Sequence, residues 1–288
     1  MTRWLVTGAG GMLGREMAAA LSARAATALG HDELDITDAD VAERAVRGHD
    51  VVVNCAAWTD VDGAERDERG AFAVNALGPL RLAEACGARG AALVHVSTDY
   101  VFAGTARVPY GTADRMAPLS AYGRTKAAGE WAVRSAAPQR SWIVRTAWLY
   151  GARTTGFVPT MLGRARDGRP SDVVADVRGQ PTWARHVAAR IVELIDRSAP
   201  PGVYHAVSSG EATWYEFARA IYEESGADPA LVRPVSAAAV PRPAPRPAYS
   251  VLHDHGERLG LTPLPHWRAA LAAAHPELAT GTAVPDLR

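Results

Sequence analysis

Lysine is almost absent from this chain. Of its 31 basic residues, Lys126 alone is lysine and the other thirty are arginine. Acidic residues also number 31, and the arginines are spread along the chain rather than clustered. The sequence therefore predicts no basic surface of the kind that binds nucleic acid or an anionic membrane. A small-molecule ligand is the better hypothesis.

Cysteine is scarce as well. Cys55 and Cys86 are the only two cysteines in 288 residues, and each lies in an apolar segment. This usage fits reduced thiols in a core and argues against a disulfide framework or a cysteine-based zinc site. No signal-peptide pattern and no run of 18 apolar residues occurs, so we expect neither export nor a membrane span. The expected location is cytoplasmic.

Strand-like and helix-like segments alternate over the first 150 residues. Apolar runs typical of buried parallel strands occupy residues 3–8, 26–30, 50–57, 91–98 and 141–147. Segments of helical periodicity lie at 12–24, 38–48, 63–90 and 120–136, the last with Ser120 as the expected N-cap. This alternation predicts an α/β fold with a doubly wound parallel sheet of the Rossmann type.

The alternation becomes looser after residue 150. Residues 1–150 and about 171–198 are expected to form a dinucleotide-binding domain, and about 151–170 and 199–288 a smaller C-terminal α/β region for the substrate. The stretch "VPRPAPRP", residues 240–247, is too rich in proline for a helix. Two interpretations of it stay open: a surface linker, or a loop that closes over a ligand.

A glycine-rich turn follows the first expected strand. In "VTGAGGMLG", Gly8 permits a tight turn, Gly11 lets backbone amides approach a pyrophosphate, and Gly14 lets the helix pack on the strand. The phosphate would then lie at the helix N-terminus, where backbone N–H groups point outward. Because a strand precedes the glycines and a helix follows them, the turn predicts a dinucleotide site.

The end of the second strand bears on the choice of cofactor. An acidic residue there would bind the ribose of NAD, but Gly30 and His31 occupy these positions. A preference for NAD is therefore not supported, and NADPH is expected, with NADH as the alternative. His31 or Arg15 could bind the additional phosphate of NADPH, or either could be an ordinary surface residue.

Tyr122 and Lys126 lie four residues apart on an expected helix, so their side chains share one face. Reduction of a carbonyl needs a hydride from the cofactor and a proton donor such as tyrosine. A nearby ammonium would lower the pKa of the tyrosine from its usual ~10. A lysine can also bind a ribose hydroxyl more compactly than an arginine can. The alternative is a chance spacing on an amphipathic helix.

Three polar residues end the fourth expected strand, at the edge of the sheet where ligands bind in such folds. Ser97 and Thr98 offer hydroxyls for a substrate oxygen or for Tyr122, and Asp99 could accept a hydrogen bond from a sugar hydroxyl. The alternative is a turn capped by these side chains.

These motifs occur in the order glycine triplet, "STDYVF", "YGRTK" and "RTAWLYG". With them the chain resembles the extended short-chain dehydrogenase/reductases, and within these the dTDP-4-dehydrorhamnose reductase family, which reduces NDP-4-keto-6-deoxyhexoses. The segments "VVVNCAAWTDVDGAE", "GQPTWA" and "RPAYSVL" are similar to further motifs of that family, so the resemblance covers nearly the whole chain.

The resemblance implies an NAD(P)H-dependent oxidoreductase that reduces the C4 carbonyl of a dTDP-linked 4-keto-6-deoxyhexose, with dTDP-4-dehydro-L-rhamnose as the first candidate and dTDP-L-rhamnose as its product. It implies that Tyr122 donates the proton, that Lys126 assists it and binds the cofactor, and that Thr98 tunes Tyr122. The expected cofactor contacts are Gly8, Gly11, Met12, Leu13, Gly14, Asp35, Ile36, Ala57, Trp58, Thr59, Tyr122 and Lys126, and the expected substrate contacts are Thr98, Asp99 and Trp148.

The chain also departs from the family pattern. Some members bind magnesium between subunits through glutamates; Glu16 matches one such position, but Arg185 stands where another is expected. No metal is therefore expected, and a homodimer remains open. Further departures, where substrate or partners would be recognised, are Asp60, Gly63, His186 and Tyr249.

Because of these departures, another dTDP-deoxysugar of specialised metabolism is an alternative substrate. Two other hypotheses stay open. One is an epimerase or dehydratase of the same fold, although no glutamate follows Asp99 as a dehydratase would require. The other is a non-catalytic regulatory subunit.

Overall fold

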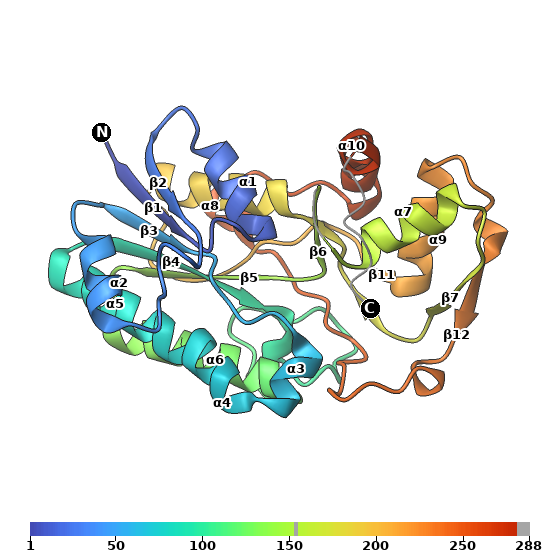
Figure 1. Cartoon of the computed structure of the whole chain (residues 1–288), viewed down its shortest axis with the longest axis horizontal. Coiled ribbons are helices and arrows are strands. Elements are labelled where there is room, and N and C mark those ends of the chain that lie inside the picture. The colour runs from blue at the N-terminus through green and yellow to red at the C-terminus, as the bar shows by residue number, and fades with distance from the viewer. Residues whose placement is uncertain (153–154, 281–288) are drawn as a thin grey trace.

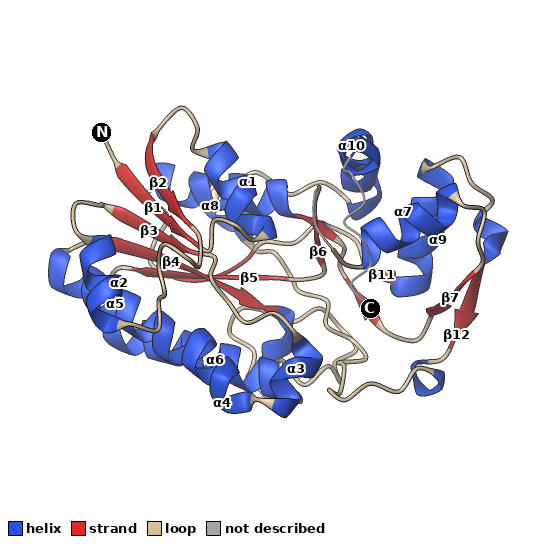
Figure 2. Cartoon of the chain, in the orientation of Figure 1, coloured by secondary structure: helices blue, strands red, loops and turns tan. Residues whose placement is uncertain are grey.

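The computed structural model describes residues 1–152 and 155–280, and residues 153–154 and 281–288 of the expected C-terminal region lie outside it. A six-stranded parallel sheet forms the larger part of the molecule (Figures 1 and 2). Its order is β10-β5-β4-β3-β1-β2. The strands are β1 (Arg3–Thr7), β2 (Ala25–Leu29), β3 (Val51–Asn54), β4 (Ala92–Thr98), β5 (Ser141–Thr146) and β10 (Gly202–His205). The predicted α/β fold with a doubly wound sheet is confirmed.

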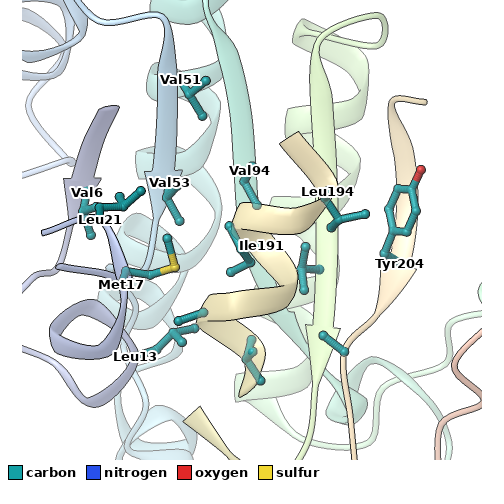
Figure 3. Close-up of a cluster of buried hydrophobic side chains, with 14 of the residues drawn as sticks. Val6, Leu13, Met17, Leu21, Val51, Val53, Val94, Ile191, Leu194 and Tyr204 are labelled. Carbon is teal, nitrogen blue, oxygen red and sulfur yellow. The ribbon is translucent and has the colours of Figure 1, made fainter. Parts of the chain in front are cut away.

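Helices cover both faces of this sheet (Figure 1). On one face lie α1 (Met12–Ala20) and α8 (Ala184–Asp196); on the other lie α2 (Ala39–Val46), α5 (Gly78–Arg89) and α6 (Ala121–Ala136). Alternate strand residues point to opposite faces. Val6, Val53 and Val94 therefore pack with Met17 and Ile191 on the α1/α8 side, as Figure 3 shows.

The chain order of the strands reverses between β1 and β3. In open α/β sheets a ligand binds at such a reversal, outside the carboxyl ends of the strands. The topology therefore predicts a ligand site at the loops that follow β1 (Arg3–Thr7) and β3 (Val51–Asn54).

The segment expected as one helix over 63–90 is divided into several. It contains α3 (Val61–Arg66), α4 (Glu68–Phe72), a π-helical turn (Ala73–Leu77) and α5. Asp67 starts α4 as its N-cap, accepting a hydrogen bond from the backbone N–H of Gly70 at 2.8 Å. Asn75 in the π-helical turn bonds through its side chain to the backbone of Trp58. Local capping and a tertiary contact therefore interrupt a continuous helical pattern.

A smaller region lies beside the large sheet (Figure 1). Its helices pack around one apolar cluster that includes Phe217 and Trp267. The elements are α7 (Phe157–Arg166), α9 (Trp214–Glu224), α10 (Trp267–Thr280) and the short strands β6 (Leu149–Tyr150), β7 (Ser171–Val174), β8 (Arg178–Gly179), β9 (Thr182–Trp183), β11 (Ala212–Thr213) and β12 (Val232–Val235). Among the described residues, no helix combines the length and apolarity that crossing a membrane would require.

Two strands lie across the boundaries expected between the two regions. Strand β10 pairs with β5 in the large sheet, although residues 199–288 were expected in the smaller region. Strand β7 pairs with β12 in the smaller region, although residues 171–198 were expected with the large sheet. Short apolar runs of this kind do not reveal their partner strand, so the sequence could not place them.

The proline-rich stretch 240–247 is anchored to the N-terminal half of the chain. The backbone N–H of Ala244 donates to Asp62 at 3.0 Å, and Arg246 donates to the same carboxylate at 2.9 Å. The stretch is extended or looped as expected. It is a fixed connection rather than a free linker.

Helix α6 packs closely on the π-helical turn, and Gly129 makes this approach possible. A Cβ at Gly129 would overlap the carbonyl oxygen of Asn75, whereas a Cβ at Gly163 in α7 would meet nothing within 4 Å. Gly129→Ala is therefore expected to lower the free energy of unfolding by ~1–3 kcal/mol. Gly163→Ala, the control, should raise it by about 0.5–1 kcal/mol. Urea unfolding of both variants measures this, and equal effects would contradict the packing argument.

Candidate active site

A cleft of about 710 Å³ opens at the carboxyl ends of β1, β3 and β4. Its size is typical of a site for a small molecule or cofactor. Most of the residues predicted from the sequence line it: Gly8, Gly11, Met12, Leu13, Asp35, Ile36, Ala57, Thr59, Thr98, Asp99, Tyr122, Lys126 and Trp148. The fold thus brings together side chains that the sequence scatters over nearly 150 positions.

Two predicted contacts do not line the cleft. Gly14 lies beneath it, where a Cβ would overlap the carbonyl oxygen of Gly8, so glycine is needed for the packing of α1 on the turn. Trp58 packs its side chain against the cluster of Ala64, Ala71 and Ala121 and donates from Nε1 to the carbonyl of Asp60 at 3.0 Å. Both residues pack against elements that form the cleft and do not line it themselves.

The glycine turn has a geometry that suits a pyrophosphate. Gly8 has φ of 65°, and a Cβ there would lie 2.6 Å from the backbone nitrogen of Ala56, so only glycine fits. The backbone N–H of Gly11 closes the turn on the carbonyl of Gly8 at 3.0 Å. Helix α1 then begins at Met12 with no side-chain cap. Its first N–H groups are left for an anionic ligand, which fits the phosphates of a dinucleotide.

The far end of the cleft contains the residues expected near the adenosine. Asp35 accepts hydrogen bonds from the backbone N–H and hydroxyl of Thr37, at 2.8 and 2.7 Å, and these bonds hold the pKa of its carboxyl below the usual value. His31 lines the cleft beside it. Arg15, the other cation considered for the NADPH phosphate, donates to the carbonyl oxygen of Gly10.

Helix α6 presents Tyr122 and Lys126 to the middle of the cleft. Ser120 caps the helix as predicted, because its hydroxyl accepts from the N–H of Gly123 at 3.1 Å. The side chain of Lys126 is 2% exposed, and its Nζ donates to the carbonyl of Val96 at 2.7 Å. Burial lowers the pKa of this ammonium to about 8. The only lysine of the chain therefore titrates close to neutral pH.

Tyr122 is protonated at neutral pH in this structure. Burial raises the pKa of its hydroxyl to about 12, and a hydrogen bond with Thr98 opposes the rise. The expected lowering of this pKa by the ammonium of Lys126 is not observed: besides burial and the bond with Thr98, the charge that acts on it is that of Asp99, which raises it further. Tyr122 can therefore hold a proton for donation, and Thr98 lies where it can orient the hydroxyl.

Thr98 and Asp99 form the turn that ends β4. The Thr98 hydroxyl donates to Asp99 at 2.9 Å and accepts from the N–H of Tyr100 at 3.2 Å. The two interpretations of these residues are compatible: their side chains cap the turn, and they also line the cleft, where they could contact a ligand. Asp99 is 2% exposed, and burial raises the pKa of its carboxyl to about 6.

An aromatic pair walls the cleft on the side of the smaller region. Trp148, which follows β5, stacks on Trp214 at the start of α9, with ring centroids 3.7 Å apart and an interplanar angle of 11°. Both rings line the cleft. Trp148 has φ of 44°, a left-handed conformation that is costly for a tryptophan and that surrounding contacts must maintain. This wall belongs to both regions of the molecule.

Trp214 was missed by the sequence analysis. It lies in the smaller region, outside every motif recognised in the sequence, and nothing in "EATWYEF" distinguishes it from a core aromatic. Only the docking of α9 against the end of β5 places it at the cleft.

Arg185 occupies the place where the family pattern suggested a metal ligand. Its guanidinium donates to Glu16 at 3.2 Å and to both carboxylate oxygens of Glu277 at 2.5 and 2.6 Å. These carboxylates are thus already paired with a fixed cation. In the part of the chain that the structure describes, no cluster of three histidine, cysteine, aspartate or glutamate side chains could hold a metal ion. The residues present do not fit magnesium.

The other departures from the family pattern lie outside the cleft lining. Asp60 caps α3 by accepting from the N–H of Gly63 at 2.8 Å. Tyr249 donates its hydroxyl to Glu211 at 3.0 Å, and His186 packs against Trp183. Their placement therefore gives no support to the expectation that these residues contact the substrate directly.

Gly179 on β8 allows the tryptophan wall to form, because a Cβ there would overlap the indole of Trp148. Gly179→Ala is expected to displace that ring from Trp214, to change the tryptophan fluorescence and to lower the free energy of unfolding by ~1–3 kcal/mol. Gly202→Ala on β10 is the control, since its Cβ would meet only Tyr204, at 4.0 Å. An unchanged spectrum for the Gly179 variant would contradict this account of the wall.

Comparison with known proteins agrees with this geometry. The family model described as "RmlD substrate binding domain" matches residues 2–280. A probable dTDP-4,6-dihydroxy-2-methyloxan-3-one 4-ketoreductase of Streptomyces antibioticus is 49% identical over 292 residues, with 99% of each chain covered. A dTDP-4-dehydrorhamnose reductase of Streptomyces griseus is 48% identical, with 99% of this chain and 98% of that protein covered.

Solved structures lead to the same family. The dTDP-4-dehydrorhamnose reductase of Bacillus anthracis, solved in complex with NADP, superposes with a TM-score of 0.91 at 34% identity and covers 96% of this chain and 100% of its own. The glycine turn, the Tyr122 and Lys126 pair and the full-length matches agree with one another. The chain is thus a member of the RmlD substrate binding domain family, as its sequence motifs indicated.

Proposed function

We propose that this protein reduces the C4 carbonyl of a dTDP-linked 4-keto-6-deoxyhexose with NADPH, and that dTDP-4-dehydro-L-rhamnose is the substrate to test first. The observation that carries the proposal is the presence of Thr98, Tyr122 and Lys126 in the cleft that also contains the glycine turn. The names of the two Streptomyces relatives support the substrate class. The B. anthracis relative bound to NADP supports the choice of cofactor.

Different residues of the cleft would bind different parts of the cofactor. Gly8, Gly11 and the first turn of α1 would hold the pyrophosphate, and His31 lines the cleft at the expected adenosine end. The bound cofactor supplies the hydride. Asp35 and Ile36 would flank the adenosine, while Ala57 and Thr59 would lie beside the cofactor. The chain itself thus binds and orients the cofactor.

Proton donation is the task of Tyr122. Its hydroxyl is protonated at neutral pH because burial raises its pKa to about 12. Thr98 would orient the hydroxyl toward the carbonyl oxygen, and the ammonium of Lys126 would stabilise the negative charge that remains when the proton leaves. Asp99 and Trp148 would position the sugar. Proton transfer from a positioned side chain supplies much of the rate in such reactions.

A second substrate deserves equal testing because one relative suggests it. The S. antibioticus protein is named for a different dTDP-linked ketone, and it is as similar to this chain as the rhamnose enzymes are. The wall formed by Trp148 and Trp214 would select between such sugars by shape. A cytoplasmic location and a homodimer also remain proposals.

The proposed function is tested by following the absorbance of NADPH, and separately of NADH, on addition of dTDP-4-dehydro-L-rhamnose. The configuration of the product at C4 is then determined by NMR. Formation of dTDP-L-rhamnose supports the proposal. If no reduced cofactor is consumed with this or with related dTDP-4-keto sugars, the reductase function is wrong, and the epimerase or non-catalytic alternatives come first.

Tyr122→Phe removes only the hydroxyl that would donate the proton. The rate of reduction is expected to fall by about 10²–10⁴-fold, while NADPH binding, measured by fluorescence titration, stays within twofold because the ring remains. Tyr150→Phe is the matched control, since Tyr150 is buried outside the cleft lining. Full activity of the Tyr122 variant would remove the basis for its role.

Activity and stability are expected to be independent of magnesium, because Arg185 already forms ion pairs with Glu16 and Glu277. Neither EDTA nor millimolar Mg²⁺ should change the thermal midpoint or the rate of reduction. Arg185→Ala is the informative comparison, since it frees both carboxylates. A rise in the midpoint of the unaltered protein on addition of Mg²⁺ would show that the ion pair does not exclude the metal.

A further inference from the structure

Helix α6 carries a fully buried glutamate one turn beyond Lys126. Glu130 is 0% exposed and accepts three hydrogen bonds: one from the hydroxyl of Ser97 at 2.6 Å, and two from Nε and Nη2 of Arg145, at 2.9 and 2.7 Å. The Arg145 side chain is 2% exposed. Such a two-pronged pair is the arrangement in which a carboxylate retains its charge away from water.

This carboxylate connects three elements at the cleft. Ser97 lies in β4 directly before Thr98, Arg145 lies in β5, and Glu130 lies on the helix that carries Tyr122. Arg145 is itself fixed, because its Nη1 donates to the carbonyl of Thr112 at 3.2 Å and its guanidinium lies 5.0 Å from the centre of the Phe102 ring. Glu130 thereby ties the end of β4 to the helix that faces it.

The titratable groups that interact with Lys126 in the described structure include Cys55, His95 and Glu130, and Arg145 is the cation paired with Glu130. Cys55, after β3, is a neutral thiol, since burial raises its pKa to about 12. His95, on β4, is neutral because burial and the ammonium itself hold its pKa well below the usual value. Tyr122 on the same helix is protonated. Asp99 lies beyond Tyr122 at the end of β4, and it bears on the pKa of that tyrosine. This leaves Glu130 as the anion one helical turn from the ammonium.

The position of Glu130 thus matters for a cation that is itself costly to bury. Desolvation disfavours the charged form of a buried lysine, and an anion nearby opposes this effect. Burial lowers the pKa of Lys126 to about 8, and Glu130 acts in the opposite direction. Without that anion, the ammonium would lose its proton at a lower pH.

We propose that Glu130 is a positioning residue for the reduction: its buried charge keeps Lys126 in the ammonium form, and its bond to Ser97 holds the end of β4 in register with Tyr122. The proposal rests on the proposed function, in which Lys126 assists Tyr122 and binds the cofactor. It assigns a role to a side chain that does not line the cleft and that acts only through its neighbours.

The composition of the chain allows a direct test, because Lys126 is its only lysine. Labelling with lysine carrying ¹³C at Cε gives a single side-chain resonance, and its titration reports the charge of Lys126 without any assay of activity. Glu130→Gln keeps the shape of the side chain and removes its charge. The midpoint of the titration is expected to fall by about one pH unit, the size of shift that a nearby opposite charge produces.

Two further variants make the result decisive. Glu16→Gln removes a glutamate that also pairs with an arginine, Arg185, but on the other face of the sheet, and it should leave the midpoint unchanged. Arg145 would be left unpaired in the single variant, which could prevent folding. The double variant Glu130→Gln with Arg145→Met removes both charges of the pair and should lower the midpoint in the same direction. An unchanged midpoint in the Glu130→Gln variant, or in the double variant where the single one does not fold, overturns the proposal.

The pH dependence of the rate of reduction is a second, independent test of the role of Glu130. At saturating substrate, the alkaline fall in kcat should move to lower pH in the Glu130→Gln variant by the same amount as the NMR titration. A shifted titration with an unshifted rate profile would overturn the role in the reaction. If the unaltered protein reduces no dTDP-4-keto sugar, the proposed function fails, and the titration still decides whether Glu130 maintains the charge of Lys126.

Discussion

Lys126 places an amino group where water hardly reaches, and several buried polar groups surround it. Its ammonium donates to the carbonyl of Val96. A carboxylate on the next turn of α6 provides the opposite charge, and a bidentate arginine holds that carboxylate in turn. Each of these buried groups would be destabilising alone, because an unpaired charge in a core costs several kcal/mol. Together they fix α6 against the ends of β4 and β5, and they place Tyr122 opposite Thr98.

The second constraint is the junction between the large sheet and the smaller region. Trp148 leaves β5 with a left-handed backbone, and its indole packs against Gly179 and stacks on Trp214. The aromatic stack offsets part of the cost of that conformation. Because the two tryptophans come from different regions, any relative movement of those regions changes the shape of the cleft. The shape of the cleft and the packing of the two regions therefore depend on the same contact.

Much of the fold could be predicted from the sequence, because the relevant signals are local. Apolar runs of strand length that alternate with helices predicted a parallel sheet. Three glycines after the first strand predicted the dinucleotide turn. The predictions that differed depended on partners distant in sequence. Strands β7 and β10 carry no local mark of the strand they pair with. The segment expected as one helix is interrupted because Asp67 caps a new helix and Asn75 bonds to Trp58.

By itself the sequence determined which chemical groups make up the site: the glycine turn, the hydroxyls at the end of β4, and a lysine four residues after a tyrosine. That lysine is the only one in a chain whose other basic residues are all arginine. Spacing on one helix was enough for this, since residues i and i+4 share a face. The tertiary structure decided what surrounds these residues. It partly buried Tyr122 so that its pKa rises, brought Trp214 to the cleft, and set Arg145 against Glu130. Desolvation and charge pairing depend on contacts between distant segments, and no local pattern in the chain specifies them.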